Sequence, residues 1–91
     1  MQIFLQFHFL APDVCTSGYE RRDGDIPGWG TDIGSRISLT REECANACTE
    51  EEQCMSFEHS NTALLCNLNK VADPTTEANY EDQVFCTKIG G

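Results

Sequence analysis

The chain has 91 residues and a formal net charge of −9 at pH 7, from six basic and fifteen acidic side chains. That balance argues against nucleic acid and anionic membrane surfaces as partners, because both reward basic patches. Six cysteines in a chain that suits one small domain indicate disulfide cross-links, since so small a domain is marginal without help.

Residues 1–12 are mostly apolar. A run of this length suits the hydrophobic region of a secretory signal, so we interpret it as a signal-peptide remnant or a disordered N-terminus. A strand is the alternative, because apolar and polar residues alternate at 7–9. No stretch is apolar over the length that crosses a bilayer, so no membrane insertion by this chain is expected. The domain is expected to span residues 13–88, with a C-terminal tail at 89–91.

Two short strands and a loop are expected before the helix. The first strand is expected within residues 14–22. Residues 23–35 are expected to form a loop, because four glycines and a proline interrupt any regular pattern, and they contain Trp29, the only tryptophan. The second strand is expected at residues 36–39, where polar and apolar residues alternate.

One helix is predicted to begin at Arg41. Thr40, followed three residues later by Glu43, has the form of a capping box, in which each side chain satisfies a free backbone N–H at a helix start. We expect the helix to end near Thr49, because the acidic run at 50–52 is unfavourable at a helix C-terminus. This run is expected to be a solvated helix end, although it also suits contact with a basic protein.

The buried face of this helix is expected to consist of cysteine and alanine. Cys44 and Cys48 are four residues apart and therefore lie on one face, which Ala45 flanks. Such small side chains allow a close approach to the neighbouring layer but bury little apolar area. Cross-links are therefore expected to supply stability that a larger core would otherwise provide.

The C-terminal half is predicted to form three strands. Residues 54–59 and 64–70 alternate between apolar and polar positions on either side of a turn at 60–62, which predicts a β-hairpin. A polar loop follows at 71–82, and residues 83–88 alternate again as a last strand.

Physical arguments narrow the pairing of the six cysteines, although several connectivities stay open. Side chains four apart on a helix lie too far apart for a disulfide, which disfavours Cys44–Cys48. The preferred pairs are Cys48–Cys54, Cys44–Cys66 and Cys15–Cys86. Zinc is disfavoured, because the chain has no C-x-x-C pair and only two histidines. We therefore expect no metal and no cofactor.

The cysteine pattern resembles that of the PAN/apple domain: a first cysteine, a glycine-rich segment, C-x3-C-x5-C-x11-C, and a last cysteine near the C-terminus. The residues that carry the resemblance are Leu39-Thr40-x-Glu42-Glu43-Cys44 with Cys48, Cys54-x-Ser56-Phe57-Glu58, Cys66-Asn67-Leu68 and Val84-Phe85-Cys86. The resemblance runs from Cys15 to Cys86, which is nearly all of the expected domain.

This resemblance implies an α+β fold, a small disulfide-rich domain in which a curved antiparallel β-sheet cradles one α-helix. It also implies bridges from the first cysteine to the sixth, the second to the fifth and the third to the fourth, which is the preferred set. The family's members are extracellular modules that bind proteins or carbohydrates and do not catalyse. The resemblance thus implies recognition or adhesion within a larger secreted or cell-surface protein, through a protein or glycan ligand that it does not name.

The glycine-rich loop supplies one group of candidate ligand-binding residues. Trp29 is a candidate for stacking on a sugar or anchoring a protein contact, with burial against the core as the favoured alternative. Arg21, Arg22 and Arg36 flank the loop and are candidates for contact with an acidic glycan or a carboxylate. Neutralisation of neighbouring aspartates is the favoured alternative for these arginines.

A second group lies on the predicted hairpin. Glu58, His59 and Asn67 are candidates for a polar sugar pocket, with an exposed cross-strand pair as the favoured alternative. The acidic stretch at 23–25 lacks the spacing of a calcium loop and is expected to be a solvated turn. Ser56 and His59 are three residues apart on one predicted strand, so they point to opposite faces and do not form a catalytic pair.

Two other classes of function compete with an extracellular recognition module. A stand-alone secreted inhibitor or toxin-like peptide would also use a disulfide scaffold. A metal-binding intracellular protein is the other alternative, and free thiols with bound zinc would identify it.

Overall fold

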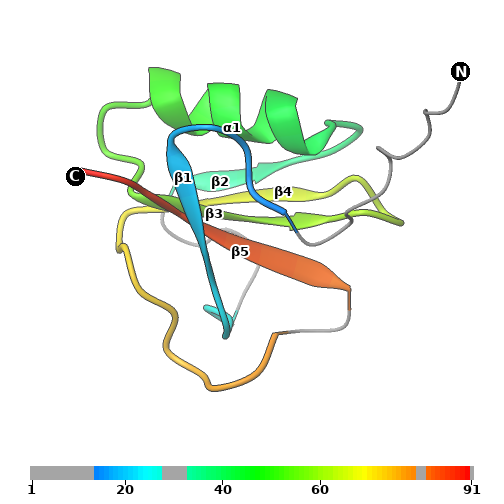
Figure 1. Cartoon of the computed structure of the whole chain (residues 1–91). Coiled ribbons are helices and arrows are strands. Elements are labelled where there is room, and N and C mark those ends of the chain that lie inside the picture. Colours follow the sequence, from blue (N-terminus) through cyan, green and yellow to red (C-terminus); the bar gives the residue numbers. More distant parts are fainter. Residues whose placement is uncertain (1–13, 28–32, 80–81, 91) are drawn as a thin grey trace, which may run out of the picture.

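The computed structural model describes residues 14–27, 33–79 and 82–90. The elements in chain order are β1 (Tyr19–Arg22), β2 (Gly34–Arg36), α1 (Arg41–Glu50), β3 (Ser56–Ser60), β4 (Cys66–Asn69) and β5 (Gln83–Lys88). The strands form one antiparallel sheet in the order β1-β5-β3-β4-β2. Figure 1 shows α1 across one face of this sheet and the long β4–β5 loop, drawn in yellow and orange, on the other side. The predicted α+β class, with one helix on an antiparallel sheet, is confirmed.

Helix α1 begins where the capping box predicts. The Thr40 hydroxyl accepts the Glu43 N–H at 3.1 Å, and the Glu43 carboxylate accepts the Thr40 N–H at 2.8 Å. The helix ends at Glu50, one residue beyond the expected end. At that end the Lys88 ammonium donates to the Cys48 carbonyl at 3.2 Å, and a cation is favourable there because helix C-termini carry partial negative charge.

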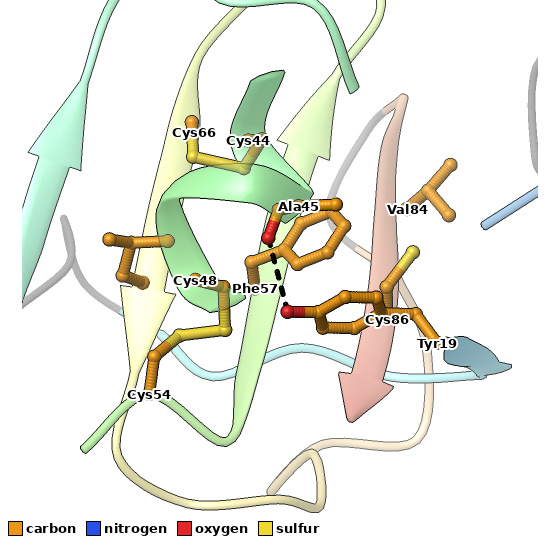
Figure 2. Close-up of a cluster of buried hydrophobic side chains, with 10 residues drawn as sticks. Tyr19, Cys44, Ala45, Cys48, Cys54, Phe57, Cys66, Val84 and Cys86 are labelled. Atoms are coloured by element: carbon orange, nitrogen blue, oxygen red, sulfur yellow. Dashed lines mark hydrogen bonds between the residues drawn. A yellow bond between two sulfur atoms is a disulfide. The ribbon is translucent and has the colours of Figure 1, made fainter. Parts of the chain in front are cut away.

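The helix packs on the sheet through the predicted narrow stripe of Cys44, Ala45 and Cys48, all of them buried. Because Ala45 has no bulk, the Tyr19 hydroxyl reaches its backbone carbonyl and donates to it at 3.1 Å. The Tyr19 ring meets Phe57 edge to face, with ring centroids 5.0 Å apart (Figure 2). The core is therefore a thin layer of aromatic rings and sulfur atoms between helix and sheet.

The three disulfides are Cys15–Cys86, Cys44–Cys66 and Cys48–Cys54, which is the preferred set. The second and third bridges fasten α1 to β4 and to the chain entering β3. The first bridge closes the longest loop, because its cysteines are 71 residues apart. Between them the bridges tie the N-terminal segment, the helix and three positions of the C-terminal half into one unit.

The predicted hairpin and last strand are confirmed as β3–β4 and β5, but the strand expected at residues 36–39 is wrong. The observed strand is β2, which ends at Arg36 opposite Cys66. Ser38 has a φ of 63°, which turns the chain out of extended conformation, and Ile37 is 74% exposed. The chain must turn here because it leaves the sheet edge to reach the helix cap above it.

The expected first strand is confirmed only in part. The first strand is shorter than residues 14–22, because Gly18 turns the chain with a φ of +90° immediately before Tyr19. The signal remnant or strand expected at residues 1–12 lies outside the described residues. Over the part of the chain that the structure describes, no helix has the length and apolar character needed to span a membrane.

Candidate functional site

The face of the sheet turned away from α1 is buried and is lined mostly by polar side chains, with Phe85 as its large apolar residue. Side chains alternate between the two faces along each strand, so the strand partners of the core residues define both faces. The buried polar residues on the far face, named the polar face here, are Ser56, Glu58, Ser60, Asn67, Asn69 and Thr87. Such a face needs both a cover and hydrogen-bond partners, because an unsatisfied buried polar group is destabilising.

Hydrogen bonds between neighbouring strands satisfy much of the polar face. The Ser35 hydroxyl donates to the Asn67 side-chain oxygen at 2.6 Å. The Asn69 amide donates to the Ser56 hydroxyl at 3.3 Å, and that hydroxyl donates to the Val71 carbonyl. The polar face is therefore an ordered network that extends from β2 to the start of the β4–β5 loop.

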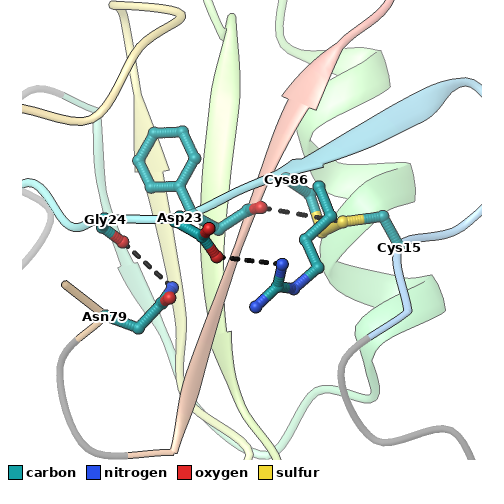
Figure 3. A network of polar contacts seen from close by, with 7 residues as sticks. Cys15, Asp23, Gly24, Asn79 and Cys86 are labelled. Carbon is teal, nitrogen blue, oxygen red and sulfur yellow. Dashed lines mark hydrogen bonds and ion pairs between the residues drawn. A yellow bond between two sulfur atoms is a disulfide. The ribbon is translucent and has the colours of Figure 1, made fainter. Parts of the chain in front are cut away.

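Two segments far apart in the sequence meet beside Glu58 of the polar face, and we name residues 24–26 and 74–79 together the clasp. The Asp25 carbonyl accepts the N–H groups of Thr75 at 2.9 Å and Thr76 at 3.1 Å. The Asn79 side-chain amide donates to the Gly24 carbonyl at 3.0 Å (Figure 3). The two segments thus hold each other through the main chain of residues 24 and 25. The solvated turn expected at residues 23–25 is confirmed only at Asp23, which is exposed, because Gly24 is buried and Asp25 is half-buried.

Gly24 permits this close approach. It is buried and has a φ of +127°, and a Cβ added to it would lie 2.6 Å from the Pro74 Cβ and would also meet the Thr76 carbonyl oxygen. We expect Gly24→Ala to lower the free energy of unfolding by about 1–3 kcal/mol more than Gly34→Ala, because the added methyl group overpacks the clasp. Urea denaturation of the oxidised variants measures this difference.

Gly34 is the matched control, because its φ of +134° imposes similar backbone strain on alanine while its Cβ would meet no atom of the described residues within 4 Å. Equal losses in the two variants would show that backbone strain alone, and not the contact with the β4–β5 loop, requires glycine at position 24.

Glu58 joins the clasp to the sheet. Its side chain is 1% exposed, and its carboxyl group accepts the Ile26 N–H at 2.7 Å. Burial, a hydrogen bond to Asp25 and the negative charge of Asp25 together raise the pKa of Glu58 to about 8, against the lowering effect of the Ile26 N–H. The raised pKa therefore keeps Glu58 mostly protonated near neutral pH, so that its O–H can donate to the Asp25 side chain.

The favoured interpretation of Glu58 and Asn67 as an exposed cross-strand pair is wrong. The two residues are direct partners on β3 and β4, but the clasp and the sheet bury both of them. Nothing local in the sequence indicates this burial, because the cover comes from segments more than ten residues away on either side. In the sequence, only Gly24 between two aspartates hints at this burial. It indicates a tight turn, but it does not show which segment packs against that turn.

His59 lies on the opposite face, beneath α1. It is buried, its Nε2–H donates to the Leu39 carbonyl at 2.7 Å, and its Nδ1 has no hydrogen-bond partner among the described residues. Burial lowers the pKa of His59, which the Leu39 carbonyl partly offsets, and the charge of Arg41 lowers it further. His59 therefore stays neutral and cannot join Glu58 and Asn67 in one pocket.

The three candidate arginines do not gather at one place. Arg21 and Arg22 lie on β1 at one edge of the sheet, whereas Arg36 lies on β2 at the opposite edge. Arg21 pairs with Asp23 at 2.9 Å (Figure 3), and Arg22 pairs with Glu20 at 2.9 Å. Arg36 is exposed and makes no ion pair within the described ranges. Trp29, the candidate in the loop, lies outside the described residues.

The arrangement does not place catalytic groups together in the described part of the chain. Ser56 lies on the polar face, where its hydroxyl is hydrogen-bonded to Val71, and His59 lies on the helix face, as their spacing predicts. Among residues 14–27, 33–79 and 82–90, no group of three or more His, Cys, Asp or Glu side chains converges as metal ligands do. The described residues thus form a disulfide-linked scaffold with a buried polar face.

Comparison with known proteins gives one match. A family model described as the PAN domain matches residues 28–87. The matched region contains β2, α1, the hairpin and nearly all of β5. It includes five cysteines, Cys44, Cys48, Cys54, Cys66 and Cys86, and it begins after Cys15. Neither the curated proteins nor the solved structures contain a match to this chain.

Proposed function

Given that the chain belongs to the PAN domain family, we propose that it is a non-catalytic recognition module that acts outside the cell. It binds a protein or a carbohydrate and forms part of a larger secreted or cell-surface protein. The family match over residues 28–87 carries this proposal. The three disulfides support the extracellular setting, because such bonds persist in oxidising compartments.

The β1 edge is the proposed ligand-contacting surface. Arg21 and Arg22 keep 42% and 39% of their side chains exposed although both form ion pairs. Exposed ion pairs are weak, so an acidic protein or glycan can replace the carboxylate partners. Trp29 stays a candidate from the sequence, because it follows β1 in the same glycine-rich connection. Glu58, Asn67 and His59 are buried, so a ligand does not reach them in this structure.

The proposal is tested with the oxidised chain on a glycan array and in pull-downs from extracellular material. For the ligand that binds, we expect Arg22→Gln to weaken binding about tenfold, which corresponds to the loss of about 1.4 kcal/mol. Arg36→Gln is the matched control, because it removes the same charge from the opposite edge of the sheet. We expect it to leave the affinity unchanged.

Two results would count against the proposal. Absence of any glycan or protein ligand for correctly oxidised chain would remove the recognition function. Equal weakening by Arg22→Gln and Arg36→Gln would leave recognition in place but would show that the ligand senses overall charge and not the β1 edge. The full-length transcript separately distinguishes a module of a larger protein from a stand-alone secreted scaffold.

A further inference from the structure

We propose that the clasp is a proton-dependent cover, closed over the polar face while Glu58 carries a proton and released when that proton is lost. The clasp is formed by residues 24–26 and 74–79, and Glu58 is the sheet residue to which it is fastened. The inference concerns the conformation of the domain and does not depend on which ligand the β1 edge binds.

The fastening involves two consecutive residues of the clasp. The Glu58 carboxyl accepts the backbone N–H of Ile26 at 2.7 Å, and it is hydrogen-bonded to the side chain of Asp25. A protonated carboxyl group can make both bonds at once, because one oxygen accepts while the O–H donates. An ionised Glu58 can only accept, so its bond to the Asp25 carboxylate is lost and replaced by repulsion.

The two parts of the clasp move together, because their mutual bonds use main-chain groups. The Asp25 carbonyl accepts from both Thr75 and Thr76, and the Gly24 carbonyl accepts from Asn79. Release of Asp25 from Glu58 therefore loosens the β4–β5 loop as well as the segment after β1. The rest of the sheet is held together by backbone hydrogen bonds between its strands and by the disulfides, none of which involves the clasp.

The surroundings of Glu58 give an ionised carboxylate no cationic partner among the described residues. Its neighbours across the strands are Asn67 on β4 and Phe85 on β5, which are uncharged. Asp25 is the charged group of the clasp that contacts Glu58, whereas Glu77, the other acidic residue of the clasp, is exposed. Arg22 on β1 lies on the same face but beyond Phe85, and it is paired with Glu20 and, at 3.9 Å, with Asp73.

The direction of the pH dependence follows from these contacts. In the closed state the pKa of Glu58 is about 8, whereas a solvated glutamate has an ordinary value of 4.5. A raised pKa means that protonation of Glu58 stabilises the closed state relative to the open state. This stabilising free energy is fully present below pH 4.5 and is lost progressively as the pH rises through about 8. Within that window the open population grows about tenfold for each pH unit. Mildly alkaline conditions therefore release the clasp from Glu58 and expose the part of the polar face around that residue.

Hydrogen exchange of the clasp amides in the oxidised chain tests this inference. The reporters are the N–H groups of Ile26, Thr75 and Thr76. Their exchange rates are expressed as protection factors, so that the pH dependence of the intrinsic, base-catalysed exchange rate cancels. We expect their protection to fall about fiftyfold between about pH 6 and about pH 8. The Thr62 N–H, which bonds to the Asp82 carboxylate at 2.9 Å, is the internal control and keeps its protection.

Glu58→Gln is the decisive variant, because glutamine accepts from Ile26 and donates to Asp25 without titrating. We expect its clasp amides to keep the same protection, within about twofold, over the whole pH range. Glu42→Gln makes the same replacement on the exposed face of α1, away from the clasp, and should behave as the unaltered chain. The inference is overturned if Glu58→Gln loses protection as steeply as the unaltered chain. Should that variant not fold, a fall at the clasp amides no larger than at Thr62 in the unaltered chain overturns it equally.

Discussion

Replacing Cys15 and Cys86 together by alanine should lower the free energy of unfolding by about 4 kcal/mol in the loop-entropy model. The expected loss is large because this bridge joins residues 71 apart and so restricts most of the unfolded chain. A small domain has about 5–15 kcal/mol of stability in all, so the variant should be close to unfolding at 37 °C. Guanidinium denaturation at 25 °C measures the loss.

The Cys48–Cys54 pair provides the comparison, because it closes a loop of only six residues by the same chemistry. Its replacement by two alanines should cost about 2 kcal/mol. A larger loss from the short loop than from the long one would show that local packing of the sulfur atoms outweighs restriction of the unfolded state. In that case the bridges would not stabilise the fold in the way proposed.

Phe57→Ala should have the second large effect, a loss of about 3–5 kcal/mol. The ring is fully buried, stands edge to face with Tyr19, and lies between the β4 and β5 positions of Leu68 and Cys86. The thin core contains few other large side chains, so the cavity cannot be filled by relaxation of its neighbours. Chemical denaturation of the oxidised variant measures the loss.

Phe57→Leu is the matched control, since it keeps an apolar side chain and should cost less than about 1.5 kcal/mol. Comparable losses from Phe57→Leu and Phe57→Ala would indicate that the edge-to-face contact with Tyr19, and not the filled volume, dominates. Losses below about 1 kcal/mol from both substitutions would contradict the assignment of Phe57 to the centre of the core.

Features with a local physical cause could be predicted from the sequence. The Thr40–Glu43 capping box locates the start of α1, and alternation locates β3, β4 and β5. The disulfide pairs follow from helix geometry and from the family pattern together. The helix start and the strands depend on residues near one another in the chain, where propensity and periodicity act directly.

Features that depend on distant segments could not be predicted. Glu58 alternates with Phe57 and so resembles the solvent-facing position of a half-buried strand, but the clasp converts that position into a buried one. Residues 36–39 alternate like a strand, but Ser38 turns the chain toward the helix cap and leaves Ile37 in solvent. In both places the tertiary path of the chain outweighs the local pattern.

The most direct test of the clasp is the titration of the Glu58 carboxyl group itself. In the oxidised chain labelled with ¹³C, the chemical shift of the Glu58 side-chain carboxyl carbon reports its protonation in the folded domain. We expect a midpoint near 8, because burial and Asp25 both favour the protonated form. A midpoint near the ordinary value of 4.5 would show that Glu58 is ionised at neutral pH and would contradict the proton-dependent cover.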